Sequence, residues 1–115
     1  MPHLVMEYSN SVEERLNIPG LLEDLHQVAL DSQLFDVPSV KSRAVRCYHW
    51  LVGESADSID FIHITFSLLE GRSEEQKAWL STQLMTLLAA SAGQVESLTV
   101  DIRDMDKGTF QRRAQ

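Results

Sequence analysis

Residues 60–67 read Asp60-Phe61-Ile62-His63-Ile64-Thr65-Phe66-Ser67, and they repeat the pattern of the opening stretch Pro2-His3-Leu4-Val5-Met6-Glu7-Tyr8-Ser9. Laid over one another without a gap, the two stretches match apolar to apolar at Leu4/Ile62, Met6/Ile64 and Tyr8/Phe66. Apolar side chains at every second position are typical of a β-strand with a buried face. We therefore predict two strands, one starting at Pro2 and one over residues 60–68, that open two related halves of the chain.

A helical pattern follows each predicted strand. In the first half, Pro19 suits the first turn of a helix that ends near Asp31. In the second half, Ser73 and Gln76 match a capping box, and Gly93 is placed to end the helix. The apolar faces consist of Leu21, Leu22, Leu25, Val28 and Ala29 in the first helix and Leu80, Leu84, Leu87 and Leu88 in the second.

A further strand follows each helix. Residues 40–52 are rich in β-branched and aromatic side chains, and residues 53–57 have the composition of a turn, which predicts a strand and a hairpin. Residues 98–103 alternate as a last strand, and the tail after Asp104 has no clear period. Because parallel strands require an intervening helix, each half reads as a β-α-β unit, over about residues 2–52 and 60–104.

These elements predict a single α+β domain over residues 1–115. Two β-α-β units side by side form a four-stranded mixed sheet with both helices on one face and leave the other face bare. A bare sheet face requires a partner, so we expect self-association.

Composition and charge exclude several classes of protein. The chain has 17 acidic and 10 basic residues and a formal net charge of −7, which disfavours binding to nucleic acid or to an anionic membrane. The single cysteine, Cys47, excludes an internal disulfide framework and agrees with a reducing compartment. The N-terminus lacks a signal-peptide pattern, and no apolar run approaches about 20 residues, so we expect a cytoplasmic protein. No spacing suggests metal ligands, a catalytic triad or a phosphate loop, so we expect no cofactor.

Three stretches resemble a known family: the opening Met-Pro-His-Leu-Val-Met-Glu-Tyr-Ser, the strand Phe61-Ile62-His63-Ile64-Thr65 and the junction Gly71-Arg72-Ser73. Together, over essentially residues 2–104, they resemble the 5-carboxymethyl-2-hydroxymuconate isomerase family of the tautomerase superfamily, which includes proteins like 4-oxalocrotonate tautomerase and macrophage migration inhibitory factor. The resemblance implies the tautomerase fold, a homotrimer whose sheets face inward, and an isomerase of aromatic-compound catabolism (homoprotocatechuate degradation) that acts on an unsaturated 2-hydroxy di- or tricarboxylate. It also implies that an N-terminal proline is the catalytic base.

Pro2 is the candidate catalytic residue. Removal of Met1 would turn the Pro2 nitrogen from an amide without basicity into a secondary amine, and the rigid ring fixes where that nitrogen points. A low-dielectric pocket and a neighbouring cation both lower the pKa of an amine toward neutrality, where general acid-base catalysis is efficient. The alternative is an ordinary edge-strand proline with Met1 retained.

A cationic run is the candidate substrate-binding segment. Residues 37–53 contain Lys41, Arg43, Arg46 and His49 and no acidic residue. Such a run would attract a small anionic substrate and stabilise the dienolate that forms during tautomerisation. The resemblance transfers a substrate-binding role most directly onto Arg72 and onto position 41, where Lys41 replaces the two-pronged arginine.

We therefore predict Lys41, Arg43 and Arg72 as substrate-binding residues. A solvated sheet edge that prevents strand pairing is the competing interpretation of Lys41 and Arg43. His63 and His3 are interpreted as structural histidines rather than as bases. Two alternatives to the isomerase remain: another activity of the superfamily, such as a hydratase, a decarboxylase or a phenylpyruvate-type tautomerase, and a non-catalytic oligomeric interaction module.

Overall fold

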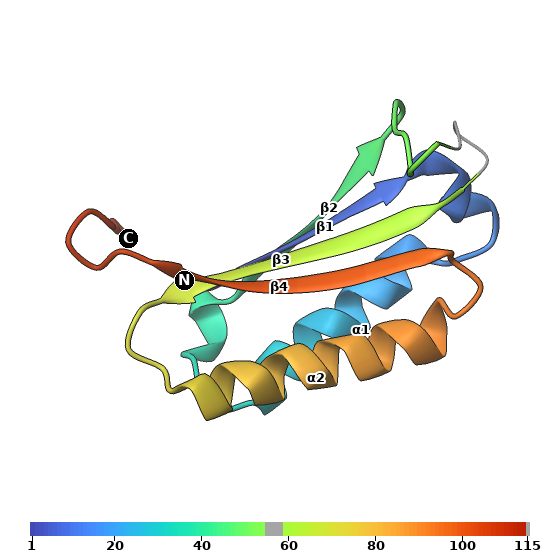
Figure 1. Ribbon diagram of the computed structural model, residues 1–115. Helices are drawn as coiled ribbons and strands as arrows, with labels where there is room; N and C mark the ends of the chain where they lie inside the picture. The colour runs from blue at the N-terminus through green and yellow to red at the C-terminus, as the bar shows by residue number, and fades with distance from the viewer. Residues whose placement is uncertain (55–58, 115) are drawn as a thin grey trace.

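Four strands form one mixed sheet, and both helices cover the same face of it (Figure 1). The computed structural model describes residues 1–54 and 59–114. In chain order the elements are β1 (His3–Ser9), the 3-10 helix η1 (Asn10–Glu14), α1 (Ile18–Asp31), the 3-10 helix η2 (Val37–Ser39), β2 (Lys41–Cys47), β3 (Phe61–Leu69), α2 (Glu74–Ser91) and β4 (Ser97–Met105). The predicted α+β class and the two helices on one face are confirmed.

The strand order β2-β1-β3-β4 reflects the internal repeat. β1 pairs with β2 in parallel, β3 pairs with β4 in parallel, and β1 and β3 meet as an antiparallel pair in the middle. In that central pair, Met6 lies opposite Ile64 and Leu4 lies opposite Phe66. Met6 and Ile64 are repeat equivalents as well as pairing partners, so a local twofold axis that relates the two halves passes between them.

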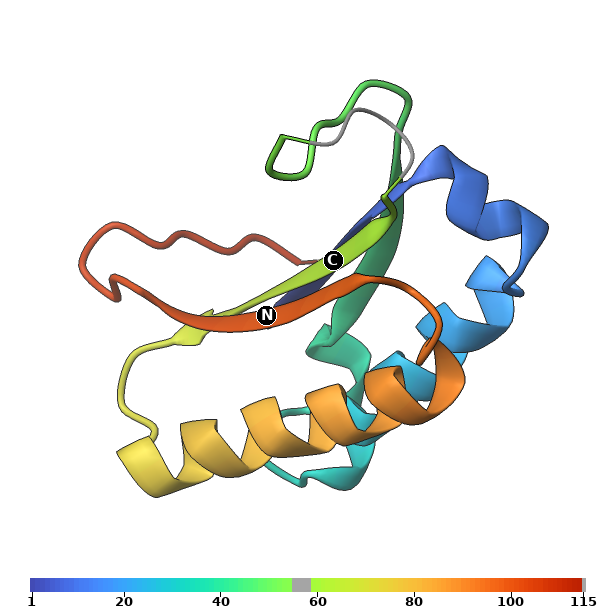
Figure 2. The ribbon, with the colours of Figure 1, turned by 45° about the vertical axis from the view of Figure 1, so that its right-hand side comes forward.

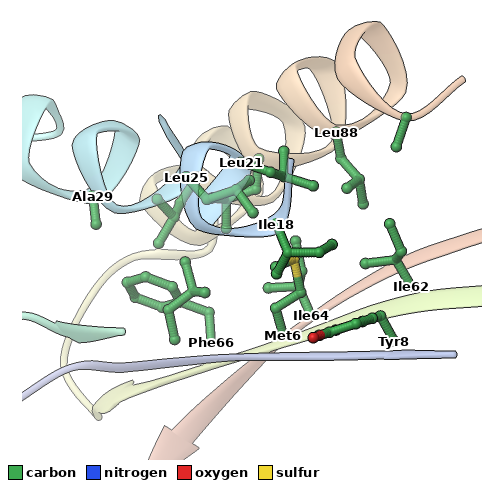
Figure 3. Close-up of a cluster of buried hydrophobic side chains, with 14 of the residues drawn as sticks. Met6, Tyr8, Ile18, Leu21, Leu25, Ala29, Ile62, Ile64, Phe66 and Leu88 are labelled. Atoms are coloured by element: carbon green, nitrogen blue, oxygen red, sulfur yellow. The ribbon is translucent and has the colours of Figure 1, made fainter. Parts of the chain in front are cut away.

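The core lies between the central strands and the two helices (Figure 3). Alternate residues of β1 and β3 are buried in this core, and Met6, Ile64 and Phe66 among them are fully buried. Leu84 and Leu88 of α2 meet them from the helix side and are fully buried as well. Full burial of one such side chain stabilises the fold by roughly 1.5–3 kcal/mol. The alternation predicted from the sequence therefore forms the core.

The first helix has Pro19 in its first turn, as predicted, with Asn17 as its cap, and the second helix begins at the predicted capping box. The Asn17 side chain accepts a hydrogen bond from the Gly20 backbone N–H at 3.1 Å at the start of α1. At the start of α2, the Ser73 hydroxyl accepts from the Gln76 backbone N–H at 3.1 Å, and the Ser73 backbone N–H donates to the Gln76 side chain at 2.9 Å. This reciprocal pair is the predicted capping box. None of the helices in the described ranges 1–54 and 59–114 combines the length and the hydropathy that crossing a bilayer requires.

The predicted hairpin after the second strand is wrong. β2 ends at Cys47, and β1 lies between β2 and β3 in the sheet, so β2 and β3 are not neighbours. Composition identifies strand-forming residues, but it does not show that an N-terminal strand inserts between two segments that follow each other in the chain. Instead of extending a strand, Trp50 donates its indole N–H to the Ile59 carbonyl at 2.8 Å. Part of the turn predicted at residues 53–57 lies outside the described residues.

Candidate active site

Pro2 is fixed at the start of the first strand. Its ring is fully buried, and its carbonyl accepts a hydrogen bond from the Lys41 backbone N–H at 3.1 Å. This bond continues the parallel pairing of β1 with β2 by one residue, because His3 is the register partner of Lys41. The sheet therefore holds the Pro2 nitrogen at a fixed place beside the first residue of β2.

The N-terminal amine lies next to a lysine. The Met1 amine donates to the Ser39 carbonyl at 2.5 Å, and the Lys41 ammonium donates to the same carbonyl at 3.2 Å. Burial lowers the pKa of the Met1 amine below its ordinary value, and the charges of Lys41 and Arg112 lower it further, against an opposing effect of Asp36. The neutral, proton-accepting form of an amine is therefore favoured at this position.

The short helix η2 supplies the carbonyl that both amines share. Pro38 sets the backbone of its first turn, and the Asp36 carbonyl accepts hydrogen bonds from the Ser39 backbone N–H at 2.9 Å and from the Ser39 hydroxyl at 2.6 Å. These bonds fix Ser39 immediately before β2. This segment did not stand out in the sequence as a structural element.

A cavity of about 380 Å³ is lined in part by Met1, the residue that carries the N-terminal amine. One side is formed by residues near the starts of β1 and β2, and the other side by the C-terminal tail. The lining residues are Met1, His3, Pro38, Lys41, Phe110, Gln111, Arg112, Arg113 and Ala114. None of these lining residues, all within the described part of the chain, is acidic. The cavity is thus a cationic site in a protein of net charge −7.

Arg43 lies two positions beyond Lys41 on β2, next to this cavity. Its Nη1 lies 3.5 Å from Nδ1 of His3, which lines the cavity. Burial lowers the pKa of His3, and the charges of Arg43, the N-terminal amine and Lys41 act in the same direction. His3 is therefore a neutral side chain among cations near neutral pH. The structure thus places Pro2 beside Lys41 and Arg43 beside His3, and neither Pro2 nor Arg43 is among the residues that line the cavity.

Arg72 does not line this cavity. Its Nη2 donates to the Leu34 carbonyl at 2.7 Å, and its guanidinium lies 5.0 Å from the centroid of the Phe35 ring. Phe35 in turn packs against the buried Phe66, with ring centroids 5.6 Å apart. In the single chain, Arg72 therefore links the loop between α1 and η2 to the core.

Arg112 and Arg113 are the cavity residues that the sequence reasoning missed. They lie in a tail without apolar period, so pattern analysis gave no position for them. The only signal in the sequence is the adjacent pair of arginines shortly after Lys107-Gly108, a dipeptide compatible with a turn.

The second half of the chain holds no corresponding amine. The position that matches Pro2 is Asp60, a buried internal residue. Its carboxylate accepts hydrogen bonds from the Ser9 hydroxyl at 2.7 Å and from Ser11, and it pairs with Arg15. Burial acts to raise the pKa of Asp60, but the hydrogen bonds from Ser11, Ser9 and Arg15 and the Arg15 charge outweigh it, so the pKa lies below its ordinary value. In the second half this position therefore joins η1 to the start of β3.

Comparison with solved structures identifies the fold of this chain. A fused 4-OT wild-type symmetric trimer has the same fold, with a TM-score of 0.71 and 20% identity, over 96% of this chain and 90% of that chain. This is the fold of 4-oxalocrotonate tautomerase, as predicted.

The family follows from the sequence match. Residues 2–110 match the family CHMI, 5-carboxymethyl-2-hydroxymuconate isomerase, and the chain belongs to this family of isomerases. The 5-carboxymethyl-2-hydroxymuconate Delta-isomerase of Escherichia coli is 24% identical over 88 residues, which cover 76% of this chain and 70% of that protein. The crystal structure of a 5-carboxymethyl-2-hydroxymuconate isomerase from Deinococcus radiodurans R1 has a TM-score of 0.87 and 27% identity, over 99% of this chain and 90% of that chain. The predicted enzyme class, an isomerase, is confirmed.

Proposed function

We propose that this isomerase catalyses keto-enol or double-bond tautomerisation of an unsaturated 2-hydroxy di- or tricarboxylate similar to 5-carboxymethyl-2-hydroxymuconate. The general acid-base is the amine of Pro2, exposed after removal of Met1. The observation that supports the proposal is the cavity itself, which Met1, Lys41 and Arg112 line together with no acidic lining residue, and in which the pKa of the Met1 amine is lowered. Removal of Met1 would expose the amine of Pro2, the next residue, at the edge of this cavity. The family's name and the relatives' names support the substrate class.

The chemistry needs one base that returns the proton it takes. The neutral Pro2 amine removes the proton of the substrate's 2-hydroxyl, so that an O–H bond breaks and an N–H bond forms. The resulting dienolate carries negative charge, which Lys41 and Arg43 stabilise by charge-assisted hydrogen bonds to its oxygens. The Pro2 ammonium then delivers a proton to the carbon at the far end of the double-bond system. A C–H bond forms, the ketone is complete, and the amine is neutral again.

Lys41, which lines this cavity, and Arg43, which contacts the lining residue His3, are the proposed substrate-binding residues. Arg72 was assigned the same role by resemblance, but its contacts with Leu34 and Phe35 favour a positioning role for it in the single chain. The variant Arg72→Ala distinguishes the two roles. If Arg72 binds the substrate, the variant should have a raised KM in addition to the stability lost with its contacts to Leu34 and Phe35. If Arg72 only fastens the loop, the variant should have a lowered free energy of unfolding.

The pH dependence of the reaction tests the proposed base. Because only the neutral amine accepts a proton, kcat/KM should fall as the pH drops below the pKa of the Pro2 amine. Lys41 lowers the pKa of the Met1 amine, and we expect it to act in the same direction on the adjacent Pro2 amine once Met1 is removed. In Lys41→Gln the pKa of the Pro2 amine should therefore rise, and the acidic limb of the kcat/KM profile should move to higher pH. Asp36→Asn removes a charge that raises the amine pKa, so the limb should move to lower pH.

The control is Lys77→Gln, which removes the same charge from a lysine bound to Glu74 and Asp104, away from the cavity. It should leave the limb in place. Movement of the limb in the same direction for Lys41→Gln and Asp36→Asn would contradict an amine base at this site.

We also propose that the active enzyme is a homotrimer. The helices leave one sheet face uncovered, where residues such as Val5, Glu7 and His63 are only partly buried by the chain itself. The fused 4-OT protein with the same fold is a trimer. Light scattering on the untagged protein should give three times the mass of one chain, and a stable monomer at micromolar concentration would contradict the proposal.

A further inference from the structure

The C-terminal tail turns back after β4 and runs over the helix-free side of the sheet toward the N-terminus (Figure 2). A tight turn at Asp106 reverses the chain. The Phe110 backbone N–H donates to the Asp106 carbonyl at 3.0 Å, and the Gly108 backbone N–H donates to the Asp106 side chain at 2.8 Å. The Lys107 backbone N–H is further tied to the Glu70 carboxylate at 3.3 Å. The fold thus places residues 110–114 at the cavity beside the amine.

The basic residues of the chain fall into two groups. Four are neutralised by acidic partners: Arg15 binds Asp60, Arg46 binds Glu13, Lys77 binds Glu74 and Asp104, and Arg103 binds Asp101. The arginines of the tail belong to the other group, which pairs with no carboxylate among the described residues and also includes Lys41, Arg43, Arg72 and Lys107. Within residues 1–54 and 59–114, no hydrogen-bond or ion-pair partner is found for Arg112 or Arg113. The chain has 17 acidic residues, yet none of them lines the cavity that Arg112 and Arg113 share with Lys41 and Met1. An anion bound there would be stabilised by charge-assisted hydrogen bonds to these cations.

The cations of the cavity come from two segments that are far apart in the chain. Lys41 comes from the sheet, and Arg112 and Arg113 come from the tail. Met1 lines the same cavity, and the charges of Lys41 and Arg112 both lower the pKa of its amine. A substrate with a carboxylate at each end can therefore bind Lys41 with one carboxylate and the tail arginines with the other, with its reacting oxygen near the amine. A monocarboxylate can bind only one of these two groups of cations.

We propose that Arg112 and Arg113 form a second carboxylate-binding wall, which makes residues 110–114 the specificity-determining segment for substrates with two or more carboxylates. The inference rests on the proposed function for the site that it deepens. Lys41 of the sheet binds the carboxylate nearer the reacting oxygen, and Arg112 and Arg113 of the tail bind the carboxylate at the other end of the substrate. The planar guanidinium suits the second task because it binds a carboxylate through two parallel hydrogen bonds.

Binding of non-reactive ligands tests this inference separately from catalysis. Calorimetry would compare adipate, a saturated dicarboxylate, with hexanoate, a monocarboxylate of the same chain length. The wild-type enzyme should bind adipate more tightly than hexanoate. The double variant Arg112→Gln/Arg113→Gln should lose roughly tenfold or more in adipate affinity, because hydrogen bonds between charged groups are removed. Its hexanoate affinity should stay within about twofold of that of the wild type.

Two further variants sharpen the result. Lys107→Gln removes a charge from the same tail outside this cavity and should leave the affinity for both ligands unchanged. Arg112→Lys/Arg113→Lys keeps the charge but loses the planar geometry, so it should recover only part of the adipate affinity. Equal losses for adipate and hexanoate in the glutamine variant would overturn the second wall, and so would unchanged adipate affinity or the absence of a wild-type preference for adipate.

The variant Pro2→Ala separates this inference from the proposed mechanism. It should retain the preference for adipate, because both walls remain, even where it has lost turnover. If Pro2→Ala keeps full turnover, the amine mechanism fails while the adipate preference still decides the role of the tail. With a reactive dicarboxylate, the double glutamine variant should show a raised KM at nearly unchanged kcat, and a loss confined to kcat would contradict a binding role.

Discussion

Replacement of Pro2 by alanine is expected to lower the ketonisation turnover number by about 10²-fold or more. Met1 is still removed ahead of alanine, so a primary amine remains where the secondary amine was. The substitution changes basicity and ring rigidity without deleting the base. Alanine also keeps the backbone carbonyl that accepts from the Lys41 N–H, so pairing of β1 with β2 should persist. Stopped-flow or steady-state ketonisation of a 2-hydroxydienoate gives the turnover number.

The control for this experiment is assembly. Light scattering and a denaturant titration should show the same oligomer, with stability lowered only because the buried ring no longer packs in the core. Near-native turnover of Pro2→Ala on every enol and 2-hydroxydienoate offered would make the amine mechanism wrong. A non-catalytic interaction module on this fold would then explain the chain better.

A glycine inserted between Met1 and Pro2 is expected to have the larger effect. After removal of Met1, the chain would begin with Gly-Pro, and the Pro2 nitrogen would be an amide with no basicity. The full contribution of a positioned general base, about 10²–10⁴-fold, should then be lost from kcat. The new terminal amine lies one residue farther from the position that Pro2 occupies in the sheet, so it does not replace the base.

The matched control is a glycine inserted near the other end of the chain, between Gln111 and Arg112, which changes length without touching the amine. It should leave kcat nearly unchanged and act on KM through the tail arginines. If the N-terminal insertion preserves kcat, Pro2 is not the base, whatever the alanine variant shows.

The sequence predicted the elements of this fold well where periodicity carries information. The apolar matches of Leu4 with Ile62 and of Met6 with Ile64 identified both central strands, and the capping box at Ser73 identified the start of α2. Each of these features depends on residues close together in the chain. Local patterns of this kind are readable because burial and capping impose a fixed spacing on the side chains.

The parts that failed depend on contacts between distant segments. The hairpin prediction was wrong because β1, from the N-terminus, separates β2 from β3. Arg112 and Arg113 were missed because a tail without period reaches the cavity only through the turn at Asp106. The contacts of Arg72 with Leu34 and Phe35 span more than 35 residues of chain and have no local signature. Lys41, on the sheet side of the candidate site, was thus named from the sequence, whereas Arg112 and Arg113, on the tail side, were found only in the structure.

One measurement tests the central claim, that the Pro2 amine is the catalytic base, most directly. Untagged enzyme is titrated with an α-keto acid, the adduct on the reacting amine is trapped by reduction, and intact mass and peptide mass spectrometry follow the loss of activity. We expect a chain that lacks Met1, complete inactivation at one equivalent per chain, and the adduct on the peptide that begins with Pro2. Full activity of chains that retain Met1, or inactivation by an adduct on Lys41 with the Pro2 peptide unmodified, would contradict this claim.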